Sequence, residues 1–235
     1  LERSRQLRVV GGSGDDVPYF ISYSLDDTDS FNVSATFGAV TSSSRSRYRL
    51  PMVEVRVGKP EFDNTGHIYS GFYTGSRFDT QPLPVDNDYR ALREGFWLAT
   101  DYAYKAAVES IARKRAALSA ASASTTDNLP DFGKADPVIS IGKITHGKLD
   151  EAAWTARIAK LSGLFNAYPE VLACGVDLHY NQDTSYLINT EGTVIRYVDD
   201  SSYISVRAEG QAADGMILRE AATFPASDEI GRAHV

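Results

Sequence analysis

The sequence predicts an α+β fold, with antiparallel β-sheets and long helices packed against them. Residues 203–209 alternate strictly, placing Ile204, Val206 and Ala208 on one side; this is typical of a strand with one buried and one wet face. Between residues 89 and 118, apolar residues recur every three to four positions, which is the period of an amphipathic helix. The two patterns together indicate strands covered by helices.

Length and charge exclude several classes of function. A chain of 235 residues is long enough for one large domain or two small ones. The net charge of −7 and the pI near 5.1 argue against a nucleic-acid-binding surface, which needs a basic excess. No apolar run approaches the roughly 18 residues of a membrane span.

The first half begins with a charged stretch over residues 1–8, interpreted as the end of a helix, and a glycine hinge follows at residues 11–14. Strands are predicted over residues 19–25 and 31–37, joined by an acidic turn at residues 26–29. A polar connector over residues 42–47 leads to a third strand over residues 52–57. Its inward residues are Val53, Val55 and Val57.

Residues 58–88 have no regular period and are expected to form a long loop, which is either functional or draped over a neighbouring element. Residues 86–88 supply N-cap candidates for a helix to about Leu118. Its expected buried face includes Trp97, Tyr102 and Tyr104, beside a stripe of Leu92, Phe96, Ala99, Ala103, Ala107 and Ile111. Residues 119–128 are rich in Ala, Ser and Thr, so the predicted units are residues 1–128 and 129–235.

The second unit is predicted to contain an edge strand at residues 138–141, a helix over residues 148–167 and an antiparallel meander over residues 171–224. The helix stripe consists of Leu149, Ala153 or Trp154, Ile158, Leu161 and Phe165. Within the meander, Gly192 stands where a tight turn needs a positive φ, and residues 199–201 are expected to break a strand. Residues 225–230 resemble the capped start of a further helix, so this unit is expected to be truncated.

Chemistry-bearing residues do not form a recognisable site. The histidines His67, His146, His179 and His234 show none of the close spacing of a helical zinc motif. His146 is interpreted as part of a helix-entry cluster with Asp150 and Glu151. His179 is placed with Asp177 on the polar face of a strand, and Cys174 is interpreted as an inert core thiol. We therefore predict no catalytic, cofactor-binding or metal-binding residue in this chain.

The order of several structural motifs resembles the amino-terminal half of TldD/PmbA-type (modulator of DNA gyrase) zinc metallopeptidases, in a long-loop bacterial branch. The resemblance spans nearly all of residues 17–226. The motifs are Pro18-Tyr19-Phe20-Ile21-Ser22-Tyr23, Ser34-Ala35-Thr36-Phe37-Gly38-Ala39, Val53-Glu54-Val55-Arg56-Val57-Gly58, Phe62-Asp63-Asn64-Thr65 and Asn189-Thr190-Glu191-Gly192-Thr193.

The resemblance implies a two-halved peptidase that acts on peptides or unfolded chains and pairs as a homodimer or with a related subunit. Zinc is implied for the complete protein, through a His-Glu-x-x-x-His motif in its later half. That motif is absent here, so the expected role is a non-catalytic portion that shapes peptide access and dimer contacts. A stand-alone binding or scaffold module is the alternative, and an independent hydrolase is a third possibility. The compartment stays open between the bacterial cytoplasm and an exported location.

Overall fold

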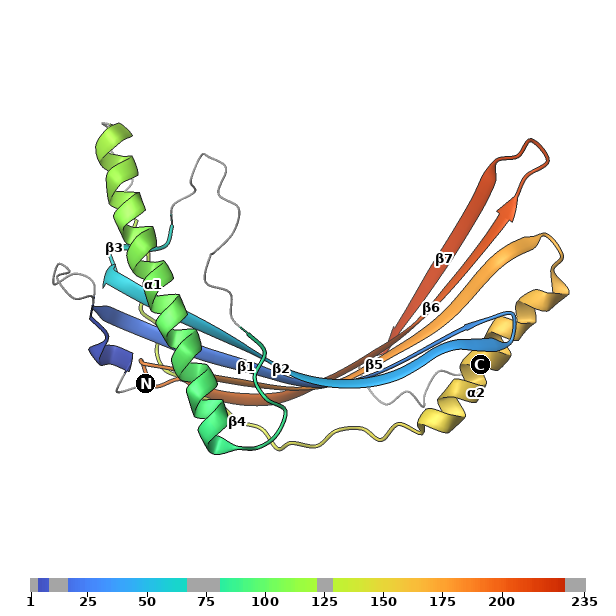
Figure 1. The fold of residues 1–235 in the computed structure, drawn as a ribbon, viewed down its shortest axis with the longest axis horizontal. Helices are drawn as coiled ribbons and strands as arrows, with labels where there is room; N and C mark the ends of the chain where they lie inside the picture. Colours follow the sequence, from blue (N-terminus) through green and yellow to red (C-terminus); the bar gives the residue numbers. More distant parts are fainter. Residues whose placement is uncertain (1–3, 9–16, 67–80, 122–128, 227–235) are drawn as a thin grey trace. The chain divides into compact units, whose positions relative to one another are not determined.

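The computed structural model describes residues 4–8, 17–66, 81–121 and 129–226. Within these ranges the fold is α+β, which confirms the predicted class: a seven-stranded sheet and two α-helices (Figure 1). No helix in these ranges is long and apolar enough to cross a membrane. The hinge at residues 11–14 and part of the long loop (residues 67–80) lie outside the described residues. Of the helix expected over residues 225–230, residues 227–230 also lie outside them, while Pro225 and Ala226 are the last residues of a strand, so that part of the prediction is wrong.

The described strands form one sheet, whereas the sequence predicts more than one. The strand order is β3-β2-β1-β5-β6-β4, and β7 also pairs with β6. Strand β4 runs parallel to β6, while β3 is antiparallel to β2 and β7 is antiparallel to β6. The strands are β1 (Pro18–Thr36), β2 (Ala39–Lys59), β3 (Phe62–Asp63), β4 (Ile139–Ile141), β5 (Val171–Asn189), β6 (Val194–Gln211) and β7 (Ile217–Ala226).

Two compact units divide the chain, but not at residue 128. The first unit comprises residues 1–26, 49–142 and 185–196, and the second comprises residues 27–48, 143–184 and 197–235. Each long strand β1, β2, β5 and β6 contributes one end to each unit. A boundary inferred from linker composition cannot reveal such a division, because it assumes that each unit is continuous in sequence.

The core of the first unit lies between α1 (Tyr89–Ala121) and strands β1 and β2. The helix begins at Asp88, whose side chain accepts hydrogen bonds from the backbone N–H groups of Arg90 and Ala91, as predicted. Trp97 is 61% exposed, so its assignment to the buried face is wrong, whereas Tyr104 is buried. The buried residues of this core are Ile21, Val55, Val57, Tyr104, Ala107 and Ile111.

The core of the second unit lies beneath α2 (Glu151–Gly163), which the short 3₁₀-helix η3 (Leu164–Ala167) extends. Asp150 caps α2 by accepting a hydrogen bond from the backbone N–H of Ala153 at 2.9 Å. Most of the predicted stripe packs inward, but Leu161 is exposed. The buried residues are Phe31, Val33, Ala35, Ile158, Val176, Leu178 and Tyr180, with Ile204 and Val206 packed against them.

The predicted acidic turn at residues 26–29 is wrong, because β1 continues through it. Arg45 donates to Asp29 at 2.8 Å, and Arg47 donates to Asp27 at 2.9 Å. Both arginines come from the predicted polar connector, which is part of β2. The chain instead turns at Phe37 and Gly38, which have φ values of 46° and 89°, as suits a two-residue hairpin turn.

The predicted strand break at residues 199–201 is also wrong, since β6 runs without interruption from Val194 to Gln211. The turn before β6 is confirmed: Gly192 has a φ of 104°. The side chain of Asn189 stabilises this turn by accepting hydrogen bonds from the backbone N–H groups of Glu191 and Thr193, both at 3.0 Å. The three-residue edge strand β4 is confirmed as well.

Candidate functional site: a buried charge network and its surroundings

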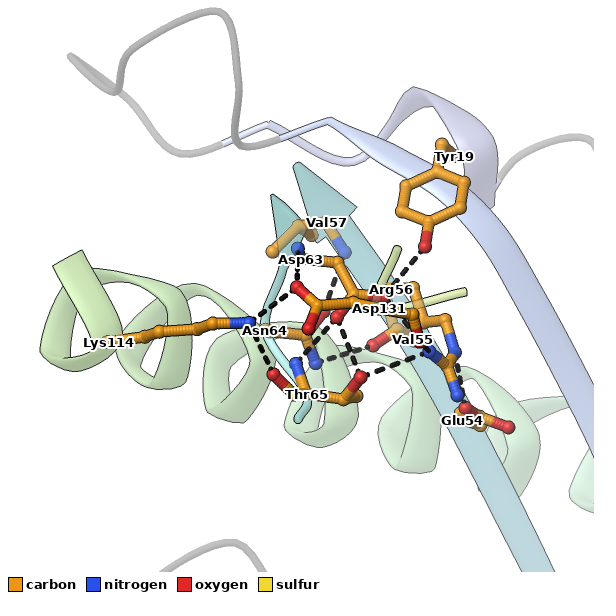
Figure 2. Close-up of polar contacts among 10 residues, drawn as sticks. All are labelled: Tyr19, Glu54, Val55, Arg56, Val57, Asp63, Asn64, Thr65, Lys114 and Asp131. Carbon is orange, nitrogen blue, oxygen red and sulfur yellow. Dashed lines mark hydrogen bonds and ion pairs between the residues drawn. The ribbon is translucent and has the colours of Figure 1, made fainter. Parts of the chain in front are cut away.

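A charge network in the first unit centres on Asp63, at the end of β3 (Figure 2). The side chain of Asp63 is fully buried. Its carboxylate accepts hydrogen bonds from the Tyr19 hydroxyl at 2.7 Å, from Nη1 of Arg56 at 2.9 Å, and from the backbone N–H and hydroxyl of Thr65, both at 2.7 Å. A buried carboxylate is stable when it is paired and hydrogen-bonded, and both conditions hold here.

Arg56 on β2 links this carboxylate to a second acid and to an aromatic ring. Its Nε donates to Glu54 at 2.6 Å, and its guanidinium lies 4.4 Å from the centre of the Phe132 ring. Residues i and i+2 of a strand share a face, which explains why Glu54 reaches Arg56. The planar guanidinium can therefore serve two carboxylates and stack on a ring at the same time.

Asp131 forms the other half of the network and connects it to α1. Its Oδ2 accepts a hydrogen bond from the backbone N–H of Asp63 at 2.8 Å and forms an ion pair with Lys114. Lys114 also donates to the backbone carbonyl of Thr65 at 2.6 Å and lies over the Phe62 ring. The lysine is buried, although the helical period places it off the apolar stripe. The network thus joins β2, β3, α1 and the segment before β4.

The electrostatics of the network fix its protonation state. Burial by itself would raise the pKa of Asp63, but hydrogen bonds from Tyr19, Thr65 and Arg56 outweigh it and hold that pKa below its ordinary value. The pKa of Tyr19 is raised, first by burial and then by its hydrogen bond to Asp63. Asp63 is therefore ionised at neutral pH, and both of its carboxylate oxygens already accept hydrogen bonds. Such a group is suited to positioning chain segments and poorly suited to transferring protons.

A second anchor in the same unit surrounds Arg49. This buried arginine donates to the carbonyls of Pro84 and Asp86, at 3.2 and 3.1 Å, and to the Asn87 side chain at 2.6 Å. Its own carbonyl accepts a hydrogen bond from the backbone N–H of Leu83 at 2.9 Å. The Asp63 network holds the chain up to Thr65, and Arg49 holds it again from Leu83 onwards.

An apolar groove of about 340 Å³ lies between residues 81–84 and the first turns of α1. Leu83 packs so closely over Gly95 that a side chain at position 95 would overlap it. Glu94 supplies an acidic group at this groove. The lining residues are Gln81, Pro82, Leu83, Pro84, Ala91, Glu94, Gly95, Leu98, Ala99 and Tyr102.

His146 in the second unit bonds to Asp200 and Thr184, not to the predicted partners Asp150 and Glu151. Its Nδ1 lies 2.7 Å from Oδ1 of Asp200, and its Nε2 lies 3.0 Å from the Thr184 hydroxyl. The order of hydroxyl, imidazole and carboxylate matches a nucleophilic triad. Thr184, however, is only 4% exposed, so a substrate has no access to its hydroxyl. The arrangement instead holds the segment before α2 against β5 and β6.

His179 occupies the predicted polar face of β5, where it is half-buried. Its Nδ1 lies 2.6 Å from the side-chain carbonyl of Asn32, and its ring stacks on Tyr203 with centroids 4.5 Å apart. Cys174 is half-buried, and its sulfur accepts a hydrogen bond from the backbone N–H of Phe37. Among the residues that the structure describes, neither His179 nor Cys174 belongs to a cluster of metal-binding side chains.

The donor set in the described ranges does not fit a zinc ion. No group of three or more His, Cys, Asp or Glu side chains is arranged there to hold a metal. The ring nitrogens of His146 are both engaged, and His67 and His234 lie outside the described residues. The expectation that this chain holds no zinc of its own stays a prediction.

Sequence reasoning missed the Asp63 network because its members are far apart in the chain. Asp63 and Asp131 are 68 positions apart. One local signal was present: Phe62-Asp63-Asn64-Thr65 carries polar side chains directly after an apolar strand. The side chain of Asn64 bonds to the backbone of Val57 and Val55, as a further strand residue would.

No protein-family model matches the sequence, and no curated protein sequence matches it. Solved structures do resemble its fold. TldE from Thermococcus kodakarensis is 11% identical, with a TM-score of 0.46, over 89% of this chain and 40% of that one. A candidate modulator of DNA gyrase from Thermotoga maritima is 12% identical, with a TM-score of 0.46, over 88% of this chain and 39% of that one.

A second candidate modulator of DNA gyrase, from Bacteroides thetaiotaomicron, is 10% identical, with a TM-score of 0.50, over 89% of this chain and 41% of that one. The chain is an α+β protein whose fold is similar to part of these structures. The resemblance to TldD/PmbA-type proteins is thereby confirmed at the level of the fold. The chain spans about two fifths of the length of the solved structures that it matches.

Proposed function

We propose that this chain is the non-catalytic, amino-terminal portion of a TldD/PmbA-like zinc metallopeptidase. The observation that carries the proposal is the fold likeness, which takes in 89% of this chain and only 41% of the Bacteroides structure. Peptide hydrolysis, in this proposal, belongs to a partner segment that carries His-Glu-x-x-x-His. The role of the present chain is to shape peptide access and dimer contacts.

The first unit supports the part of the proposal that concerns peptide access. The groove beside α1 is mainly apolar, with Glu94 as its acidic group, and its volume of about 340 Å³ falls within the range of ligand pockets. The Arg49 anchor fixes residues 83–87, which include one wall of this groove. Such a site suits an apolar peptide side chain that is followed by a basic one.

The test compares the chain alone with the chain supplied with its catalytic partner segment. The purified 235-residue chain is incubated with zinc and an unfolded reporter peptide, and it is expected to release no product. Addition of the downstream segment that carries His-Glu-x-x-x-His should restore cleavage. A Leu98→Glu substitution in the groove should then raise KM with little effect on kcat, while the exposed control Lys134→Glu should change neither.

A stand-alone binding or scaffold module is the competing function. That function would be favoured if the downstream reading frame contained no His-Glu-x-x-x-His motif and if the chain bound the reporter peptide without cleaving it. Hydrolysis by the chain alone would contradict both functions.

A further inference from the structure

A pocket of about 370 Å³ opens on strands β5, β6 and β7 in the second unit. Strand β6 pairs with both β5 and β7, so the three strands offer one continuous surface there (Figure 1). The volume falls within the range of small-ligand sites. The pocket shares none of its lining residues with the groove proposed for peptide access. The lining residues are Ala173, Cys174, Arg207, Ala208, Glu209, Arg219, Glu220 and Ala221.

The floor of the pocket is made of small side chains. Arg207 and Ala221 are opposite each other in the β6–β7 ladder, so their side chains share one face of the sheet. The guanidinium of Arg207 reaches across to Gly175 on β5, where an added side chain would overlap it. Ala173 stands two residues before Gly175 and shares that face. Because Ala173 and Ala221 end at Cβ, they leave an apolar space beside the arginine.

Side chains of both charges border this space. Nη1 of Arg207 lies 3.0 Å from Oδ2 of the buried Asp177, and Nε of Arg219 donates to Oε2 of Glu209 at 2.7 Å. A guanidinium has more N–H donors, and a carboxylate more lone pairs, than one such partner uses. Glu220 adds a further negative charge to the lining. A ligand with a single sign of charge would meet a like charge here, whereas a zwitterion is matched at both of its charges.

We propose that this pocket binds a free α-amino acid with an apolar side chain. The ligand's carboxylate pairs with Arg207, whose planar guanidinium suits a carboxylate. Its ammonium group donates to Glu209, which Arg219 holds in position. Its side chain lies on Ala173 and Ala221, where it buries apolar surface.

Two structural details favour an amino acid over a longer zwitterion. Residues two apart on a strand, such as Arg207 and Glu209, are separated by about 7 Å. Two long side chains at that spacing can close around charged groups that are carried by one carbon atom. In addition, contacts with β5 hold the guanidinium of Arg207 in place before a ligand arrives, and such preorganisation lowers the cost of binding. The proposal does not depend on the proposed function, because it concerns another pocket and needs no peptidase partner.

L-leucine and two analogues test the assignment of the two charged groups. 4-Methylpentanoate lacks the ammonium group, and L-leucinamide lacks the carboxylate. In NMR chemical-shift titrations at neutral pH, the wild-type chain should bind L-leucine with a Kd of about 1 mM or lower. Each analogue should bind about tenfold more weakly, because it loses a hydrogen bond to a charged group. Glu209→Gln should abolish the preference for L-leucine over 4-methylpentanoate and keep the preference over L-leucinamide.

A pair of substitutions tests the floor of the pocket. Ala221→Leu should fill the apolar space and weaken L-leucine binding about tenfold. Ala222→Leu is the matched control, because this adjacent exposed residue points to the opposite face of the strand, and it should leave binding unchanged. Thermal unfolding followed by circular dichroism verifies that each variant is folded.

Four outcomes would overturn the proposal. The first is a wild-type chain that shows no binding of L-leucine at about 10 mM, a concentration that saturates a millimolar site. The second is inorganic phosphate or either analogue binding as tightly as L-leucine. The third is an unchanged preference for L-leucine over 4-methylpentanoate in Glu209→Gln. The fourth is equal weakening by Ala221→Leu and Ala222→Leu.

Discussion

Nη1 of Arg207 lies 3.0 Å from Oδ2 of Asp177 and supplies the charge that this buried carboxylate needs. The side chain of Asp177 is 8% exposed, whereas that of Arg207 is 64% exposed. The contact is an ion pair without the alignment of a hydrogen bond. Arg207 also lies against Gly175, where an added side chain would meet its guanidinium. Strand alternation places Arg207 opposite to Val206 and so on the outer face, where the structure has it. Alternation does not reveal that its guanidinium pairs with a buried carboxylate.

Arg207→Ala is expected to lower the free energy of unfolding by about 1–2 kcal/mol, because it leaves a buried carboxylate without its cation; the cost stays below that of a fully buried pair, because water already reaches the exposed guanidinium of Arg207. Arg219→Ala removes an exposed partner of Glu209 and should cost less than about 1 kcal/mol. Urea midpoints at neutral pH measure both. Equal shifts for the two variants would show that Asp177 does not depend on Arg207.

Val206→Asp should unfold the second unit, because Val206 packs against its buried core. Burying an unpaired carboxylate costs several kcal/mol, comparable to the stability of a whole domain. Val206→Ile is the matched apolar control and should retain a cooperative transition. Thermal unfolding followed by circular dichroism distinguishes them, and a cooperative transition in Val206→Asp would place residue 206 outside the core.

Asp63→Asn should change the pH dependence of the free energy of unfolding. The pKa of Asp63 is lowered in the folded state, so its contribution is present above its ordinary pKa, near 4, and is lost as the pH falls through the folded value. The variant should be about 3 kcal/mol less stable at pH 7 and should lose less stability between pH 5 and pH 2.5. Asp136→Asn, at an exposed position, is the control, and its free energy of unfolding should depend on pH as that of the wild type does. If Asp63→Asn lost as much stability as the wild type between pH 5 and pH 2.5, the assigned role of Asp63 in the network would be contradicted.

Thr184→Val should cost about 1–3 kcal/mol, because it leaves Nε2 of His146 without its hydroxyl partner. A positioning role predicts that neither the wild type nor this variant hydrolyses an activated ester above background. Ester hydrolysis in the wild type that Thr184→Val abolishes would instead identify a nucleophile.

The isolated chain is expected to contain no stoichiometric zinc. His146 is engaged by Asp200 and Thr184, so releasing it to a metal would break two existing contacts. Elemental analysis of tag-free protein after dialysis provides the measurement. One tightly held zinc per chain, retained after a brief chelator wash, would show a site built partly from residues beyond the described ranges.

The helices were predictable because their signals are local. Asp88 and Asp150 stand directly before α1 and α2 and cap them, and both apolar stripes follow the helical period. The acidic stretch at residues 26–29 was misread as a turn, since the arginines that pair with Asp27 and Asp29 are 20 and 16 residues away. Continuity of β6 through Asp200 depends in the same way on His146, 54 residues earlier.

The candidate site was less predictable than the fold, for the same physical reason. Lys114 lies on the charged side of its helix by sequence pattern, yet it is buried because Asp131 and the Thr65 carbonyl receive its ammonium group. Single-sequence patterns report which side chains favour water. They do not report which distant partner compensates for a buried charge.

The Asp63 network holds the chain before residues 67–80, and the Arg49 anchor holds it after them. A change in the length of that segment therefore need not alter the core of the first unit. A chain whose two ends are already held requires little further free energy to grow: doubling the length of a flexible connection costs only about 0.6 kcal/mol. A flexible Gly-Ser insertion between Gly66 and Gln81 should therefore leave the Asp63 and Arg49 contacts in place and the unfolding transition of the first unit nearly unchanged. This position is accordingly one where related chains can diverge in length and acquire new specificities without refolding the scaffold that carries them.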